Sequence, residues 1–423
     1  MKRKFGTVSV VGLGYIGLPT AAMFASRKIR VVGVDVNVRT VETINRGEVH
    51  IVEPDLDIAV QSAVQQGYLR ATTGPEAAEA FLIAVPTPFK GSGYEPDLSY
   101  IEAASKAIAP VLEPGNLVVL ESTSPVGATE QMASWLAEAR PDLTFPQTHG
   151  EASDIRIAHC PERVLPGKVM QELIHNDRVI GGLSPRCSEV AMSLYKSFVE
   201  GECVITDART AEMAKLVENS FRDVNIAFAN ELSVICDGLD INVWELIQLA
   251  NRHPRVNILQ PGPGVGGHCI AVDPWFIVSR SPDQARLIRT ARQVNDDKPK
   301  WVIEQAVKAV ADYLAENPGK RAEEVTVACY GLAFKPDIDD LRESPALAIA
   351  TLLAQSHPGP VWAVEPNIGD LPAALGALHL KSAETALAEA DIGLLLVDHK
   401  EFKSLPAPRG KWLDFKGIWL EKA

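Results

Sequence analysis

The sequence contains no long apolar run and no excess of positive charge. No stretch approaches the ~18 consecutive apolar residues of a membrane-spanning helix, so we expect no membrane association. The formal net charge is −13, which argues against a nucleic-acid partner because binding to a phosphate backbone requires a basic face. Small anionic ligands stay possible, since they need only a few local cations and helix N-termini.

Metal-ligating clusters are also missing from the sequence. The six cysteines lie far apart, and neither a CxxC pair nor a Cys/His group has the spacing of a zinc site, so we expect no metal. A chain of 423 residues can build a large core without disulfides, which favours reduced thiols and a cytoplasmic protein. Residues 1–4 are basic and precede an apolar stretch, as in a signal peptide, but glycines and a proline interrupt that stretch. We expect a strand and a helix there.

The first half of the chain alternates strand and helix patterns. At roughly 100–200 residues per domain, the length predicts two or three domains. Strands are predicted at 7–11, 29–34, 80–85, 117–120 and 179–181, and helices at 18–27, 100–112 and 129–140. This alternation is typical of a parallel, doubly wound sheet.

The pattern changes after Thr206. From Asp207, a predicted helix N-cap, to about Asn317 the periodicity is helical, except in the Pro/Gly-rich stretch 254–274. Alternation then resumes, with strands predicted at 325–330, 361–364 and 392–397 and a helix at 344–355. The expected fold class is therefore α/β, with two Rossmann-like doubly wound domains, 1–205 and 318–423, joined by a central all-helical domain, 206–317.

A glycine turn follows the first predicted strand. The turn has a GxGxxG pattern made by Gly12, Gly14 and Gly17, with Tyr15 and Ile16 between the last two. This pattern predicts a tight turn, close approach of a pyrophosphate and close packing of the helix. Asp35 closes the second strand, 18 residues after Gly17, where an acid binds ribose hydroxyls. Such an acid repels a 2′-phosphate, so the sequence favours NAD over NADP. The alternative is a glycine turn without a nucleotide.

Three threonines lie near the predicted carboxyl ends of later strands. Thr87, Thr123 and Thr129 follow two of the strands, and ligands of open α/β sheets bind at those ends. We therefore predict that they contact the cofactor. A turn or a helix cap explains each of them equally well.

The segment 262–274 combines glycines and prolines with one cysteine and one aspartate. Its glycines leave Cys269 uncovered by side chains of its own loop, and a thiol with a lowered pKa is a strong nucleophile at neutral pH. The alternative is a small core residue, but the loop lacks core periodicity. For Cys236, within a helical pattern, we expect the core position.

Upstream of this loop, a helical pattern carries Lys215, Asn219 and Arg222 at spacings that place them on one stripe. Apolar residues lie on the opposite side: Met213, Val217, Val224 and Phe228. From this segment alone, a solvated face of an amphipathic helix is the favoured interpretation.

Several blocks together resemble the UDP-glucose/GDP-mannose dehydrogenase family. They read VGLGYIGLPTA, PTPFKG, ESTSPVG, CPERVLPG, EMAKLVENSFRDVNIAFANE, PGPGVGGHCIAVDPWF and YGLAFKPDIDDLRESP, occur in family order and cover nearly the whole chain. The stretch 251–260 resembles the branch that acts on UDP-N-acetyl-D-mannosamine. Val272 stands where UDP-glucose enzymes commonly have a basic residue, which disfavours UDP-glucose. UDP-N-acetylglucosamine and UDP-glucose stay open as alternative substrates.

The resemblance implies a four-electron oxidation of a sugar CH2OH to a carboxylate with NAD. In this family Cys269 would hold the sugar as a thiohemiacetal and then as a thioester, which water hydrolyses. Lys215, Asn219 and Asp273 match the catalytic lysine, asparagine and aspartate of the family. A lysine and an amide can stabilise oxyanions, and Asp273 and Glu162 can position or deprotonate water.

The resemblance also implies the substrate contacts. They are expected at Arg163, Val164, Lys215, Asn219, Arg222, His253, Arg255, Gly266, Phe334 and Lys335. The third region, which lacks a GxGxxG, would bind the uridine side, with Arg342 reaching NAD. For Arg342 an ion pair with Asp339 or Asp340 is the alternative.

Two other protein classes are weaker alternatives. A β-hydroxyacid dehydrogenase lacks the cysteine loop and a third domain, and a non-catalytic nucleotide-sugar sensor would not need Cys269. Family members form homodimers through long central helices, for which 291–314 is the expected segment. The resemblance also implies a role in the biosynthesis of bacterial surface polysaccharides such as enterobacterial common antigen.

Overall fold

The computed structural model describes residues 5–91, 94–165, 167–267, 269–372, 375–406 and 410–419. Residues 1–4 and His268 of the cysteine loop lie outside these ranges. The chain divides into two compact units, Met1–Glu218 and Asn219–Ala423. The boundary falls within one continuous helix, α9 (Ala208–Gly238).

The first unit is built on a large sheet. Its strands are β1 (Thr7–Val11), β2 (Arg30–Val34), β3 (Leu69–Thr72), β4 (Ala80–Ile83), β7 (Leu117–Leu120), β8 (Arg156–His159), β9 (Arg178–Gly182) and β10 (Cys203–Asp207), and β5 (Phe89–Lys90) and β6 (Glu95–Pro96) form a separate pair. Its helices are α1 (Gly17–Ser26), α2 (Val38–Asn45), α3 (Leu56–Gln65), α4 (Ser99–Ile108), α5 (Ala128–Ala139), α6 (Pro146–His149), α7 (Val169–His175) and α8 (Pro185–Tyr195).

The strand order in this sheet is β10-β9-β8-β7-β4-β1-β2-β3. The direction of successive connections reverses between β1 and β4, which is where open α/β sheets bind their ligands. The expected parallel pairing holds for the described strands of this sheet except between β8 and β9, which pair antiparallel. The expectation of a wholly parallel sheet was therefore wrong at this pair, because the chain between the two strands returns through the short α7 rather than through a full crossover helix.

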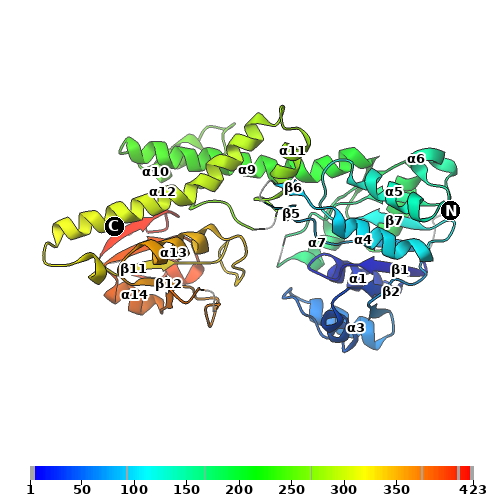
Figure 1. Ribbon diagram of the computed structural model, residues 1–423, viewed down its shortest axis with the longest axis horizontal. Helices are drawn as coiled ribbons and strands as arrows, with labels where there is room; N and C mark the ends of the chain where they lie inside the picture. Colours follow the sequence, from blue (N-terminus) through cyan, green and yellow to red (C-terminus); the bar gives the residue numbers. More distant parts are fainter. Residues whose placement is uncertain are drawn as a thin grey trace. The chain divides into compact units, whose positions relative to one another are not determined.

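Helices cover both faces of the sheet (Figure 1). One core cluster joins α1, α3, α7 and α8 to the sheet, and a second joins α4 and α5 to the other face. Alternate side chains of β1 enter the two clusters: Val8 and Val10 point to the first and Val11 to the second. This two-sided burial explains why the strands read as continuous apolar runs.

After β10 the chain is helical. Asp207 caps α9, because its Oδ1 accepts the backbone N–H of Thr210 at 2.9 Å, which confirms the predicted N-cap. The following helices are α10 (Val243–Ala250), α11 (Asp273–Arg280) and α12 (Arg286–Glu316). In the described part of the chain, none of the helices combines the length and apolar character that crossing a membrane requires.

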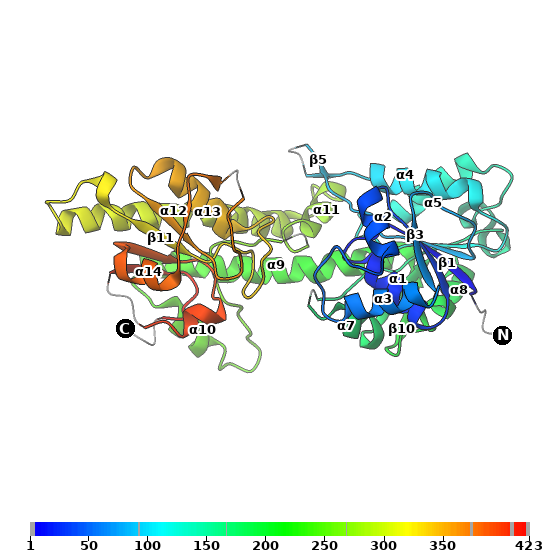
Figure 2. The same ribbon diagram turned by 90° about the horizontal axis from the view of Figure 1, so that it is seen from below.

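The second unit ends in a smaller sheet with the order β13-β12-β11-β14-β15. Its elements are β11 (Val327–Tyr330), α13 (Pro345–Ser356), β12 (Val361–Val364), β13 (His379–Leu380), α14 (Ala383–Glu389), β14 (Ile392–Leu395), α15 (Lys400–Lys403) and β15 (Lys411–Asp414). Helices α12 and α13 pack on one face of this sheet, as Figure 2 shows, and α14 and α15 on the other. The fold class, two doubly wound α/β parts with a helical part between them, is confirmed.

Candidate functional site

The glycine turn between β1 and α1 has the geometry that a dinucleotide requires. Gly12 has φ +91°, and a Cβ there would lie 2.7 Å from the carbonyl oxygen of Ala84. A Cβ on Gly17 would collide with the Gly12 carbonyl, at 1.8 Å. A Cβ on Gly14 would meet no heavy atom of the described residues within 4 Å, so the turn is open there, where a pyrophosphate approaches the backbone.

Asp35 joins the two sides of this turn. Its Oδ2 accepts the backbone N–H of Leu13 at 3.0 Å, and its Oδ1 accepts that of Asn37 at 2.9 Å. The carboxylate is half-buried at the end of β2, which leaves lone pairs for ribose hydroxyls.

The three predicted threonines have different surroundings. The Oγ1 of Thr87 is buried and has no hydrogen-bond partner among the described residues, so it can bond to a ligand. Thr123 is half-buried after β7. Thr129 is fully buried, and its hydroxyl donates to Glu212 at 2.6 Å, so its side chain already has a protein partner. Gly14, Asp35 and Thr87 together fit NAD.

Glu162 lies in a buried cluster with Arg178. Its Oε2 is 2.9 Å from Arg178 Nη1, and both side chains are buried. Glu121 belongs to the same cluster, since Tyr195 donates a hydrogen bond of 2.6 Å to its Oε1. Burial raises the pKa of Glu121 to about 7, although Arg178 opposes that shift. Burial disfavours the charge of Arg178, but Glu162 and other neighbours raise its pKa, so the guanidinium stays charged.

Arg163 is likewise paired within the first unit. Its guanidinium contacts Glu218 of α9 through Nε at 3.1 Å and Nη2 at 2.5 Å. Val164 and Lys215 are half-buried, and Lys215 lies between Glu212 and Glu218 in α9. Carboxylates therefore flank the predicted catalytic lysine along the helix.

Cys269 stands at the start of a turn that leads into α11. Its carbonyl oxygen accepts the backbone N–H of Val272 at 3.1 Å and of Asp273 at 2.9 Å. The buried carboxylate of Asp273 accepts a hydrogen bond of 2.5 Å from Asn219 Nδ2. The structure therefore brings together the predicted Cys269, Asp273 and Asn219 in the second unit.

The thiol of Cys269 differs from the other five. All six cysteines lie in the described part of the chain and none of them forms a disulfide, and Cys269 alone is exposed. Burial raises the pKa of Cys160 and of Cys329 to about 12, so these thiols stay protonated. The alternative of a core position is wrong for Cys269, whereas Cys236 is buried as expected.

Buried polar side chains anchor the glycine loop that precedes Cys269. Asn230 Oδ1 accepts the Gly262 N–H at 2.8 Å, and Asn230 Nδ2 donates to Asn295 Oδ1 at 2.9 Å. Asn295 in turn donates to Asp223 Oδ1 at 2.8 Å, which also pairs with Arg292 at 2.6 Å. The loop is thereby fixed to α9 and α12.

The same loop packs against the segment that follows β11. A Cβ on Gly266 would lie 2.4 Å from the Glu343 carbonyl and 3.0 Å from Phe334 Cβ, and one on Gly267 would lie 2.9 Å from the Phe334 ring. No other residue fits this approach. Gly266 and Phe334, which the resemblance implied separately, are therefore neighbours.

The remaining predicted cations are more exposed. Arg222, His253 and Arg255 are exposed, and Lys335 is half-buried with its Nζ 5.9 Å from the Phe334 ring centroid. Arg342 pairs with Asp340 at 2.6 Å, the ion pair that the sequence left open as an alternative.

The polar stripe of helix α9 is solvated only in part, because Arg222 is exposed and Lys215 is half-buried. Asn219 is buried, whereas Met213, Val217 and Phe228 are 37%, 45% and 53% exposed. The interpretation as a solvated face was therefore wrong for Asn219, because a helix can bury a polar residue when a partner such as Asp273 satisfies it.

Sequence reasoning missed the partners of the predicted residues. Arg178, Glu212 and Glu218 were not singled out, although each contacts a site residue or its loop. Arg178 had a detectable signal, since it is a charged residue at the start of an apolar strand. The two glutamates had the weaker signal of i±3 spacing from Lys215.

Family comparison agrees with this arrangement. Residues 6–199 match the NAD binding domain of the UDP-glucose/GDP-mannose dehydrogenase family, 209–297 its central domain and 328–417 its UDP binding domain. The chain belongs to this family. It is an NAD-dependent dehydrogenase, and its C-terminal part is a UDP binding domain.

Relatives match along nearly the full length of this family member. A UDP-N-acetyl-D-mannosamine dehydrogenase from Yersinia pestis is 68% identical over 98% of this chain and 99% of its own. An NDP-N-acetyl-D-galactosaminuronic acid dehydrogenase from Ralstonia nicotianae is 63% identical over 99% and 97%. The solved structure of a UDP-D-ManNAc dehydrogenase from Pyrococcus horikoshii has a TM-score of 0.85 and 39% identity, covering 97% of this chain and 96% of that one.

Proposed function

We propose that this dehydrogenase oxidises the C6 hydroxymethyl group of UDP-N-acetyl-D-mannosamine to a carboxylate, with Cys269 as the covalent nucleophile. The observation that carries the proposal is the position of Cys269: an exposed thiol in a glycine loop, one turn before the buried Asp273. A two-electron dehydrogenase has no use for such a thiol, whereas a four-electron oxidation needs to retain the aldehyde.

When bound, NAD accepts the two electrons and one hydrogen of a C–H bond in each oxidation. Between the oxidations, the Cys269 thiolate adds to the C6 aldehyde, so that an S–C bond forms and the carbonyl oxygen takes a proton. The second oxidation converts this thiohemiacetal to a thioester. Water then attacks the thioester carbon, the C–S bond breaks, and Cys269 leaves as a thiolate. The sum is one sugar, two NAD and one water, giving the carboxylate, two NADH and three protons.

We assign Asn219 and Lys215 to stabilising the negative charge that develops in these steps, and Asp273 to proton transfer. The oxygen on C6 becomes negative when the thiolate adds and again when water adds, and an ammonium group and an amide N–H stabilise such oxyanions. Asn219 uses one N–H to hold Asp273 and carries a second one. Asp273 takes a proton from the attacking water. Glu162, held by Arg178, is assigned to orienting that water.

The nucleotide end of the substrate is assigned to the second α/β part. Phe334 offers a face to the uracil, and Lys335 and Arg255 offer charge to the diphosphate. Arg222, His253 and Gly266 are assigned to the sugar and phosphates, as are Arg163 and Val164. Arg342 is assigned to NAD and would exchange its partner Asp340 for the cofactor.

Relatives support the manno configuration of the sugar and also provide its main competitor. The Yersinia pestis enzyme is named for UDP-N-acetyl-D-mannosamine, and the Ralstonia nicotianae enzyme, nearly as similar, for the galacto sugar. An NAD-dependent dehydrogenase of UDP-N-acetylgalactosamine is therefore the second candidate.

Substrate profiling with purified enzyme separates these candidates. NADH formation is followed with UDP-N-acetylmannosamine, UDP-N-acetylgalactosamine, UDP-N-acetylglucosamine and UDP-glucose, and the product is identified by mass spectrometry. We expect the highest kcat/KM with the manno sugar and two NADH per sugar. A preference for another sugar contradicts the substrate, one NADH per sugar contradicts the covalent double oxidation, and binding without turnover points to a sensor.

We further propose a homodimer in which α9 supplies the interface. Val217, Phe221, Phe228 and Ile235 repeat at helical spacing and are 45%, 68%, 53% and 48% exposed. Within the expected segment 291–314 of α12, Val307 is the exposed large apolar residue, at 56%. An apolar stripe of this kind is typical of a subunit interface, so α9 replaces that segment as the favoured helix.

The chemistry also favours a reducing compartment. Cys269 must stay a free thiol in every catalytic cycle, and exposed thiols persist where disulfides do not form. We therefore propose that the enzyme works in the cytoplasm, where it would supply an N-acetylated uronic acid for bacterial surface polysaccharides.

A further inference from the structure

Three neighbouring strands of the C-terminal sheet end in the same buried hydrogen-bond cluster. Strands β12, β11 and β14 are adjacent and parallel, so their carboxyl ends meet at one edge of the sheet. Glu365 follows β12, the segment 331–337 follows β11, and His399 follows β14. Glu365 is 4% exposed and His399 is 0% exposed.

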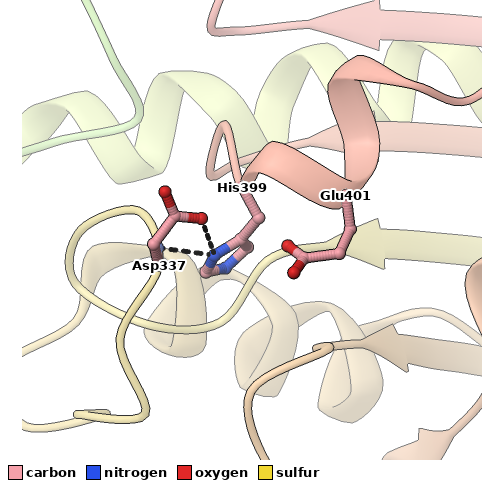
Figure 3. A group of neighbouring side chains, drawn as sticks. All are labelled: Asp337, His399 and Glu401. Carbon is pink, nitrogen blue, oxygen red and sulfur yellow. Dashed lines mark hydrogen bonds and ion pairs between the residues drawn. The ribbon is translucent and has the colours of Figure 1, made fainter.

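The contacts of His399 determine which ring nitrogen carries the proton. Its Nδ1 accepts the backbone N–H of Asp337 at 2.9 Å and the side-chain N–H of Asn367 at 3.0 Å. Figure 3 shows Asp337 and His399 facing each other across this bond. Because Nδ1 accepts, the proton is on Nε2, which donates to Glu365 Oε2 at 3.0 Å.

Glu365 continues the same chain of bonds. Its Oε2 also accepts the backbone N–H groups of Leu332 and Ala333, at 2.8 Å and 3.1 Å. Burial alone would raise the pKa of Glu365, but the bonds from His399 and from the backbone lower it to about 2. The carboxylate is therefore ionised and accepts from every partner.

Glu365 and His399 thus hold the segment 331–337 at both ends. Glu365 fixes its start at Leu332 and Ala333, and His399 fixes its end at Asp337. Asp337 has φ +61°, a left-handed conformation that costs a non-glycine residue free energy and persists only when its surroundings enforce it. A second bond from the same turn, Lys400 N–H to Asp337 Oδ1 at 3.0 Å, adds to that constraint.

Phe334 and Lys335 lie between these two anchors. Phe334 packs so closely against Gly266 and Gly267 of the cysteine loop that neither position has room for a side chain. A shift of the segment would therefore move the nucleotide contacts and the surface on which the cysteine loop rests.

We propose that His399 is a positioning residue that fixes the segment 331–337 through the Nδ1 acceptor for Asp337, and thereby sets both nucleotide affinity and the presentation of Cys269. This inference rests on the proposed function in one respect, that Phe334 and Lys335 contact the nucleotide. It assigns to a fully buried side chain a role that it exerts through its neighbours.

A metal site is the competing interpretation of the same side chains. Ligand atoms of Asp337, His399 and Glu401 lie within 4.8 Å of one another. Figure 3 draws these three side chains. A metal would need the lone pair of one ring nitrogen, however. Nδ1 already accepts two N–H groups, and Nε2 donates to Glu365. The hydrogen-bonded role uses the geometry as it stands.

Two substitutions separate the two ring nitrogens. In His399→Asn the side-chain oxygen can take the place of Nδ1, while the bond to Glu365 is lost. In His399→Gln the amide N–H can take the place of Nε2–H, while the acceptor for Asp337 is lost. We expect His399→Ala and His399→Gln to weaken UDP binding about tenfold, the cost of one unsatisfied N–H, and His399→Asn to restore most of the affinity. Calorimetric titration with UDP measures the affinity of each variant.

His357 provides the matched control. It bonds Val325 O at 2.7 Å before β11, at the opposite edge of the same sheet, so His357→Ala should lower the melting temperature and leave UDP affinity unchanged. Parental UDP affinity in His399→Ala, or equal affinities of the Asn and Gln variants, would overturn the proposal. Zinc or manganese that copurifies stoichiometrically and is lost in His399→Ala would replace it with the metal site.

Cys269 alkylation by iodoacetamide, followed by peptide mass spectrometry, tests the second half of the proposal without any substrate. We expect the rate to change at least threefold in His399→Gln and to return in His399→Asn; an unchanged rate overturns the link to the cysteine loop. Both readouts are independent of sugar turnover. A parental enzyme that fails to oxidise UDP-N-acetylmannosamine refutes the proposed function and leaves the role of His399 to be decided by these data.

Discussion

Asn219 Nδ2 donates a hydrogen bond of 2.5 Å to Asp273 Oδ2. This bond joins α9 to the first turn of α11 and fixes a buried carboxylate one turn beyond Cys269. The carboxylate oxygen of Asp273 accepts this bond from the amide. A carboxylate that acts as an acceptor is what a general base must be before it takes a proton from water.

Asp273→Asn should therefore block the hydrolysis of the thioester more than its formation. We expect a burst of NADH followed by a steady rate at least about 100-fold below the parental one, a typical loss for a general base. Intact-mass spectrometry of acid-quenched enzyme should show the sugar acyl group on Cys269. Asp283→Asn, an exposed aspartate beyond the end of α11, is the control. A parental rate, or a slow rate without the adduct, contradicts the role of Asp273.

Cys269→Ser should bind UDP-sugar and NAD with parental affinity but form no carboxylate. The serine hydroxyl stays protonated at neutral pH and cannot hold the sugar as a thioester. Uronate formation is measured by chromatography, with Cys203→Ser, which removes the half-buried thiol, as the control. Near-parental uronate formation by Cys269→Ser would rule out the covalent mechanism.

Asp35 should have two separable effects, because its carboxylate holds Leu13 and we expect it to repel a 2′-phosphate. Asp35→Asn keeps an acceptor for the Leu13 N–H and removes the charge, so NAD affinity should fall little while NADP binding improves. Asp35→Ala should also weaken NAD about tenfold, because the turn loses a charge-assisted bond. The KM values for NAD and NADP measure both effects. The same cofactor preference in all three proteins would show that Asp35 does not contact the ribose.

Phe221→Arg should convert the proposed dimer to a monomer, since a charge in the centre of the apolar stripe on α9 opposes association. Val307→Arg, at 56% exposure on α12, should leave the dimer intact. Light scattering coupled to size-exclusion chromatography gives the mass of each variant. If Val307→Arg dissociates the dimer and Phe221→Arg does not, the interface is on α12.

Glu121 makes stability depend on pH. Burial raises its pKa from 4.5 to about 7, so the folded protein binds this proton more tightly than the unfolded chain does. The resulting stabilisation is full below pH 4.5 and is lost as the pH rises through about 7. Glu121→Gln stays neutral and should increase the free energy of unfolding above pH 7, by at most ~3 kcal/mol.

Urea unfolding at pH 5 and pH 8 tests the predicted direction of this pH dependence. The difference between Glu121→Gln and the parent should be larger at pH 8, whereas the exposed Glu48→Gln should change stability by less than ~0.5 kcal/mol at both. An equal gain at the two pH values would mean that Glu121 is already ionised in the folded protein at pH 5 and would contradict the raised pKa.

Local patterns in the sequence were sufficient for much of the fold. The strand predicted at 361–364 is β12 with the same bounds, and Asp207 caps α9 as its side chain predicted. Each of these depends on residues within a few positions of one another, which is the range over which propensity, capping and periodicity act. The exposure of Cys269 followed in the same way from the lack of core periodicity in its loop.

Partners far apart in the sequence were decided only by the tertiary structure. Even between near neighbours the fold decided: Arg342 had two aspartates within reach by spacing, and the folded segment selects Asp340. The antiparallel pairing of β8 with β9, the burial of Asn219 against Asp273 and the contact of Gly267 with Phe334 likewise have no local signal. A hydrophobic pattern specifies which face a residue occupies, but which distant groups meet there depends on strand order and helix packing. The sequence alone thus determined the type of chemistry and the fold class, and the tertiary structure decided how each reactive group is held.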